Sequence, residues 1–127
     1  MALRLGERER LDYFRDGFLL RHSVFDAEQV ERWRDAVERV VALVIGRARR
    51  PDAGPEMRLG DGHRLQFSSR TVIQWEWREG SPDIRLLEPF THLDPRFNAL
   101  WEDPRLVEPV RDMLGVEART GFGIAKL

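Results

Sequence analysis

The sequence predicts a single domain with an α+β fold, and three patterns in its 127 residues support this prediction. Apolar residues recur at a helical period through 30–44, and apolar and polar residues alternate through 65–77. Two Asp-Pro pairs, at 94–95 and 103–104, are typical of helix starts. Helical segments gather largely in the front part and do not alternate regularly with strands. This order favours an α+β fold over repeated βαβ units.

The first predicted helix covers about residues 5–15 and ends at Gly17, because glycine readily adopts the left-handed conformation that terminates helices. We expect Leu11 and Phe14 to lie on the inward side of this helix. The next four residues, 18–21, predict a short strand.

The clearest helix begins after Asp26, a favoured N-cap, and Gln29 three residues later completes a capping box. Its apolar residues form one face of a helix: Val30, Trp33, Val37, Val40, Val41 and Val44. A group of three arginines follows at its end: Arg47, Arg49 and Arg50. We interpret this group as cations that complement the helix dipole, with an anion site as the alternative.

Residues 51–62 contain two prolines and three glycines and therefore predict a loop. The alternating segment 65–77 predicts either one strand or two strands joined by a turn near Ser68 and Ser69, with one buried face. Which of the two arrangements holds is left open by the pattern itself.

The last part of the chain predicts two short helices and a strand. Asp94-Pro95 and Asp103-Pro104 read as N-cap and first helical residue, so helices are expected over 95–102 and 104–114. Gly115 ends the second helix. Alternating residues then predict a strand from 116 to 127.

Composition excludes several classes of protein. The 21 basic and 22 acidic residues give a net charge of −1, which argues against a nucleic-acid binder because such proteins carry a basic excess. The absence of cysteine excludes thiolate metal sites, disulfides and cysteine nucleophiles. The first residues lack the apolar core of a signal peptide, and the longest apolar run, 40–45, is too short to cross a membrane. We expect a cytoplasmic protein without membrane or nucleic-acid partners.

Several segments resemble, in their order along the chain, the phytanoyl-CoA dioxygenase (PhyH) family. They are 13–20 with Asp16-Gly17-Phe18, 25–30 with the helix around Trp33, 92–97, 103–107 with Leu114-Gly115, and 121–127. The resemblance implies a double-stranded β-helix of the jelly-roll or cupin kind that uses Fe(II) and 2-oxoglutarate to hydroxylate a small-molecule substrate. It also implies that residues 1–127 are a single partial domain, truncated before the iron-binding motif.

Members of this family hold iron with a His-x-Asp pair and a distant second histidine. His92-Leu93-Asp94 has this spacing, but Asp94 stands at a predicted helix start, where its carboxylate is needed as a cap. No histidine follows His92, and we expect His22 and His63 on the surface. We therefore assign no metal ligand and no catalytic residue.

Lys126 is the first of three candidates for binding 2-oxoglutarate. Strand parity places it with Phe122 and Ile124 on the expected buried face. A lysine there is costly unless it meets an anion, and in this kind of enzyme a carboxylate of 2-oxoglutarate would be that anion. A bulge at a glycine of this strand, or a chain end that lets the lysine reach water, is the alternative.

Arg70 and Gln74 are the other two candidates, on the less apolar side of the segment 65–77. They would line the mouth of a barrel or face solvent, and the pattern does not decide between these positions.

Two functions remain. The first is the N-terminal portion of an Fe(II)/2-oxoglutarate dioxygenase, inactive alone because it lacks the iron triad. We expect this chain alone to bind neither Fe(II) nor 2-oxoglutarate. The second is a non-catalytic interaction or dimerisation module derived from that fold, which would self-associate through the edge of its C-terminal strand.

Overall fold

A computed structural model describes residues 4–115 and the backbone of residues 125–126. The elements of this part of the chain are, in order, α1 (Glu7–Asp16), α2 (Ala27–Ala48), β1 (Glu56–Arg58), β2 (Arg64–Ser68), β3 (Thr71–Trp75), β4 (Ile84–Glu88), the 3-10 helix η1 (Thr91–Leu93), α3 (Pro95–Trp101), α4 (Pro104–Leu114) and β5 (Ala125–Lys126). All strands belong to one antiparallel sheet in the order β1-β2-β3-β4-β5. The prediction of an α+β fold is confirmed.

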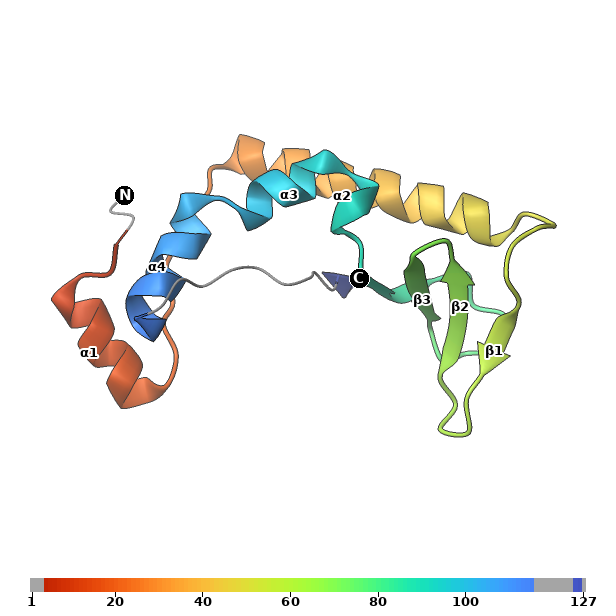
Figure 1. The fold of residues 1–127 in the computed structure, drawn as a ribbon, viewed down its shortest axis with the longest axis horizontal. Helices are drawn as coiled ribbons and strands as arrows, with labels where there is room; N and C mark the ends of the chain where they lie inside the picture. The colour runs from red at the N-terminus through yellow and green to blue at the C-terminus, as the bar shows by residue number, and fades with distance from the viewer. Residues whose placement is uncertain (1–3, 116–124, 127) are drawn as a thin grey trace.

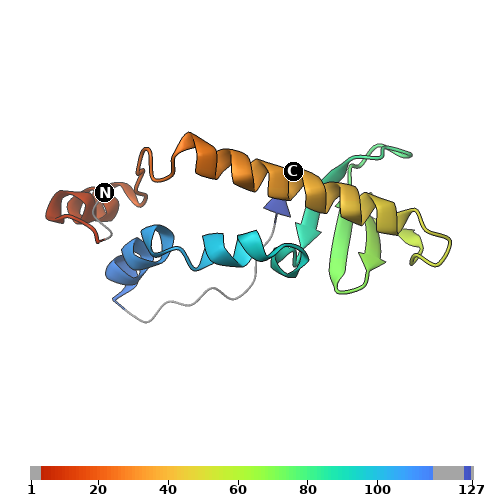
Figure 2. The same ribbon diagram turned by 90° about the horizontal axis from the view of Figure 1, so that it is seen from above.

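The molecule is elongated, with α1 at one end and the sheet at the other (Figure 1). The long helix α2 spans the distance between them, and its second half crosses one face of the sheet (Figure 2). The helix α3 packs beside α2. One helical layer therefore covers one face of the sheet.

The helix α2 starts as the sequence predicts. The carboxylate of Asp26 accepts a hydrogen bond from the backbone N–H of Gln29 at 2.8 Å, and the Gln29 side chain accepts one from the N–H of Asp26 at 3.2 Å. Its inward face supplies part of the core, which consists of Ala36, Val40, Val44, Ile73, Trp75, Ile84, Leu87, Phe90 and Phe97. The apolar period therefore identified the packed face correctly at Val40 and Val44, whereas Val30 is exposed.

The alternating segment forms two strands joined by a turn at Ser69 and Arg70, so the second of the two predicted arrangements is correct. Ser69 has a φ of 55°, in the left-handed region that a tight turn demands. The register pairs Gln66 with Ile73. Directly paired residues of an antiparallel sheet share a face, so the even-numbered residues of β2 lie with the odd-numbered residues of β3.

The turn therefore shifts the alternation of inward and outward side chains by one residue, and this shift decides which side chains of β2 are buried. Arg64 and Gln66 face α2 and are 3% and 7% exposed, whereas Phe67 on the other face is 53% exposed. A single continuous strand would have put Phe67 on the same face as Ile73.

The first predicted helix is present as α1, and Gly17 ends it with a φ of 77°. The expected inward positions of Leu11 and Phe14 are wrong, because these side chains are 64% and 77% exposed. Polar contacts hold this end of the chain instead: the guanidinium of Arg21 donates to the Glu9 carboxylate at 2.8 and 2.9 Å.

Three further differences concern strands. Residues 18–21 are not a strand, and the predicted loop 51–62 contains β1. The strand β4 was not predicted, although its apolar residues lie between Pro82 and Pro89. The predicted strand over 116–127 lies outside the described residues except at β5, which pairs with β4.

Both Asp-Pro pairs are helix caps, as expected. In each, the arginine that follows the proline adds further hydrogen bonds. Asp94 accepts from the backbone N–H of Arg96 at 2.9 Å and from its guanidinium at 3.0 and 2.7 Å. The same guanidinium donates to the carbonyl of Arg32 in α2 at 3.2 Å. Asp103 and Arg105 repeat this arrangement, with Arg105 donating to the carbonyl of Val24 at 3.3 Å. The pairs therefore dock α3 and α4 onto the first part of α2 and the residues before it.

The Asp94 cap predicts a pH dependence of stability. The hydrogen bonds from Arg96 lower the pKa of Asp94 from 3.8 to about 2. A depressed carboxyl pKa stabilises the fold fully above the unfolded-state pKa, and this contribution is lost as the pH falls through the folded-state pKa of about 2. Asp94→Asn keeps a capping oxygen but cannot ionise.

We expect Asp94→Asn to unfold in urea with roughly 1–2 kcal/mol less stability than the parent chain at neutral pH. The difference should shrink toward zero as the pH approaches 2. Glu31→Gln is the control, because Glu31 forms an exposed pair with Arg34 and should change little. A difference for Asp94→Asn that stays constant from neutral to acid pH would contradict this account.

Candidate functional site

The structure places two of the three candidate residues in one row across the sheet. Gln74 of β3 pairs with Leu86 of β4, and Leu86 pairs with Lys126 of β5. The same row continues from Gln74 through Leu65 to Met57 of β1. Residues paired in this way share a face, so Gln74 and the register position of Lys126 lie on the same side of the sheet. The side chain of Lys126 is outside the described part of the structure.

The third candidate, Arg70, is not on a strand. It occupies the two-residue turn between β2 and β3 and is exposed. The sequence pattern continued through this turn without a break, which is why Arg70 appeared to belong to the same strand as Gln74.

The face that carries Gln74 is the one that α2 does not cover. Its residues are largely apolar, and none of them is buried: Met57, Leu65, Phe67, Val72, Gln74, Leu86 and the acidic Glu88. On the opposite face, Ile73 and Leu87 are fully buried. We call this set the open sheet face. An apolar sheet face of this kind is stable in folded proteins when a second layer covers it.

In the described part of the structure, the three histidines lie in different places and do not form a cluster. His22 is exposed in the segment before α2, and His63 lies 2.8 Å from the Asp61 carboxylate in the β1–β2 connection. His92 lies 3.3 Å from the hydroxyl of Thr71. Asp94, the carboxylate of the His-x-Asp sequence, is engaged as the cap of α3.

Fe(II) therefore finds no fitting donor set in this part of the structure. No group of three or more His, Cys, Asp or Glu residues within 4–115 lies close enough to hold a metal ion. No chemical step through iron follows from these residues.

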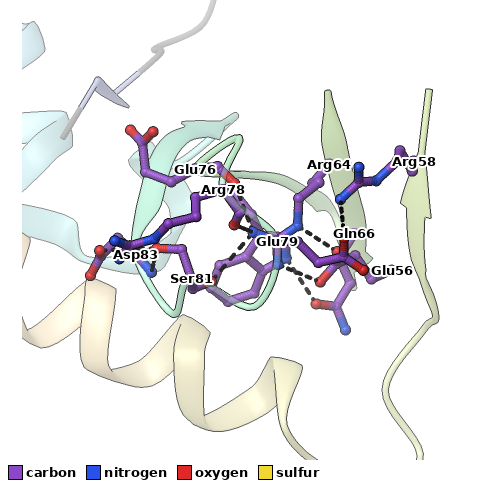
Figure 3. Close-up of polar contacts among 10 residues, drawn as sticks. Glu56, Arg58, Arg64, Gln66, Glu76, Arg78, Glu79, Ser81 and Asp83 are labelled. Atoms are coloured by element: carbon purple, nitrogen blue, oxygen red, sulfur yellow. Dashed lines mark hydrogen bonds and ion pairs between the residues drawn. The ribbon is translucent and has the colours of Figure 1, made fainter. Parts of the chain in front are cut away.

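Within residues 4–115, the most heavily buried charge is Arg64 at the start of β2, which sequence reasoning did not single out (Figure 3). Its guanidinium donates to both oxygens of Glu56 at 2.7 and 3.0 Å. It also donates to the backbone carbonyls of Glu76 and Arg78 at 2.7 and 2.6 Å. Arg64 thus joins β1 to the connection between β3 and β4.

Gln66, two residues along β2, makes a second set of buried contacts. Its amide donates to the carbonyls of Ala48 and Gly54 at 3.0 and 2.7 Å, and its oxygen accepts from the indole of Trp75 at 3.1 Å. These bonds attach the end of α2 and the following loop to the sheet.

The electrostatics of Arg64 indicate a structural role. Its hydrogen bonds hold the pKa of the Glu56 carboxyl below the usual range, and those of Glu56 raise the pKa of Arg64. Both groups therefore remain charged at neutral pH and are paired with each other, which suits neither a general acid nor a general base. The parity change at the turn was the signal that would have identified Arg64 and Gln66 as inward-facing.

Comparison with known proteins adds no identification, since no protein-family model, curated protein or solved structure matches the chain. As for membranes, none of the described helices has both the length and the apolar character that a bilayer span requires.

Replacing Arg64 tests how much the fold depends on it. Arg64→Met should lower the free energy of unfolding by about 2–4 kcal/mol, because the Glu56 carboxylate and two backbone carbonyls lose their donor. Arg58→Gln is the matched control, since Arg58 forms an exposed pair with Glu79 at 3.4 Å. That variant should change stability by no more than about 0.5 kcal/mol. Equal losses in the two variants, measured by urea denaturation, would show that the buried contacts carry no special weight.

Proposed function

We propose that this chain forms the supporting helices and first strands of an Fe(II)/2-oxoglutarate dioxygenase domain of the PhyH kind. The observation that carries the proposal is the division of the sheet into two faces. The α2 helix covers one face, and the open sheet face, which is apolar and contains Gln74, has no buried residue. A jelly-roll packs two sheets face to face, so it needs one sheet with a face of this kind.

The resemblance and the element order support the same proposal. The Asp16-Gly17-Phe18 segment ends α1, Asp26 caps α2, and the two Asp-Pro pairs open α3 and α4. Each segment that resembles the family within the described residues therefore marks the boundary of a helix. In this proposal the open sheet face meets a second sheet that the described residues do not contain, and the two enclose the substrate.

Gln74 and Lys126 are proposed to bind a carboxylate of 2-oxoglutarate between these sheets. Their backbone positions are two strands apart in one row, which corresponds to about 10 Å. An ammonium and an amide are both hydrogen-bond donors that suit a carboxylate. Arg70 in the turn lies at the end of the same hairpin and is the secondary candidate.

Titration of 2-oxoglutarate into isotopically labelled protein, followed by NMR, tests this assignment. Because the described residues supply only one wall of this site, we expect only weak binding by this chain alone, seen as small shifts of the backbone amides of Gln74 and Leu86 at high ligand concentration. Lys126→Met should reduce these shifts, because one charged hydrogen bond is lost. Gln74→Leu should also weaken the binding, and Arg58→Gln should not. Shifts that survive both Gln74→Leu and Lys126→Met would refute the assignment.

Catalysis is tested separately with the same protein. The proposal predicts that the purified chain, given Fe(II), 2-oxoglutarate and oxygen, forms no succinate above the rate without protein, because 4–115 supplies no iron donor set. Oxygen-dependent formation of succinate would overturn the proposed role as a supporting portion.

A self-associating module is the second candidate function. The observation in its favour is that β5 ends the strand order and pairs only with β4 among the described strands. An edge strand presents unpaired backbone groups that a second copy can use. A concentration-independent dimer in light scattering, lost in Ala125→Pro, would favour this module, because proline removes a backbone donor. A monomer would exclude it.

A further inference from the structure

A polar pocket of about 300 Å³ lies at the end of α2. Its walls come from three segments: the last turn of α2, the loop that follows it, and the end of β2 with the turn after it. The lining residues are Arg47, Arg50, Asp52, Ala53, Gly54, Phe67, Ser68 and Ser69. We call it the α2-end pocket.

Buried contacts fix the walls of the α2-end pocket. Gln66 donates to the carbonyls of Ala48 and Gly54, which attaches both the helix end and the loop to the sheet. A Cβ at Gly54 would lie 2.9 Å from the carbonyl oxygen of Phe67. Only glycine lets the loop approach β2 this closely, so the pocket is preformed.

The two arginines of this pocket make few strong interactions within the described residues. Arg47 is exposed, and among the described residues its guanidinium has no hydrogen-bond or ion-pair partner. Arg50 pairs with Asp52 at 3.1 and 3.3 Å, but both side chains are mostly exposed. An exposed pair of this kind is weak, and a stronger anion can replace the carboxylate.

Capping of the helix does not account for these arginines. The carbonyls of Ile45 and Arg47 accept backbone N–H groups, and the carbonyl of Ala48 accepts from Gln66. These three carbonyls therefore have hydrogen-bond partners without the guanidinium groups. Complementation of the helix dipole needs no hydrogen bond and stays a prediction, and the anion site is the alternative that the pocket supports.

The opposite wall supplies hydroxyl donors. Ser68 ends β2 and Ser69 stands in the turn, and the hydroxyls of both lack a hydrogen-bond partner among the described residues. The two arginines and two serines that line this pocket carry donors that match the several oxygens of a phosphate group. We propose that the α2-end pocket binds a phosphate dianion, either inorganic phosphate or the phosphate of a small monoester.

Isothermal titration of the parent chain with inorganic phosphate and with phenyl phosphate tests this proposal. Arg47→Gln should weaken binding of the probes about tenfold, because it removes one charge-assisted donor. Ser69→Ala should weaken it less, since a neutral donor is lost. Asp52→Asn should tighten binding, because it frees Arg50 and removes a competing carboxylate.

Arg49→Gln is the matched control, because Arg49 is an exposed arginine at the same helix end that does not line the pocket. It should leave the affinity within about twofold of the parent. Equal affinity for both probes would identify the phosphate group as the ligand, and tighter binding of phenyl phosphate would identify a monoester.

The proposal is overturned if neither probe binds, or if Arg49→Gln weakens binding as much as Arg47→Gln. The second result would show that the general charge of the helix end, and not the pocket, attracts the anion. Circular dichroism of each variant checks that it is folded, which is expected because the substituted side chains are exposed or half-buried.

Discussion

The register of the β2–β3 hairpin is the constraint on which the rest of the sheet depends. A two-residue turn pairs Gln66 with Ile73, so Arg64 and Gln66 enter the side of the sheet that α2 covers. Both are polar, and burial without partners would be costly. Their hydrogen bonds meet this requirement by joining the sheet to β1, to the β3–β4 connection and to the end of α2. The buried polar contacts thus connect β1, the β3–β4 connection and the end of α2 through β2.

The same register leaves the other face of the sheet apolar and open, because it turns Leu65 and Phe67 away from α2. This division of faces gives the dioxygenase proposal its physical basis, since the row through Gln74 and Lys126 lies on the open side. Farther from the sheet, charge pairs help to hold the helices together. Arg96 and Arg105 each join a helix cap to a backbone carbonyl, at Arg32 and at Val24 respectively.

Sequence reasoning succeeded where a signal was local. The capping box of Asp26 and Gln29, the glycine ends at Gly17 and Gly115, and the Asp-Pro caps each depend on residues within one helical turn. It failed for Leu11 and Phe14, whose apolar character predicted burial but which are exposed. The candidate Arg70 was misplaced for a related reason, since alternation alone does not reveal a turn.

The amino-acid sequence by itself determined the helix boundaries, the apolar face of α2 and the α+β class, because these follow from short-range periodicity and capping. Only the tertiary structure decided which face of β2 is buried, that Arg64 and Gln66 are the polar centre of the sheet, and that Arg47 shares a pocket with Ser69. The physical reason is that strand register depends on turn length and on pairing between distant residues. A shift of one residue reverses every side chain of a strand while leaving its sequence pattern unchanged.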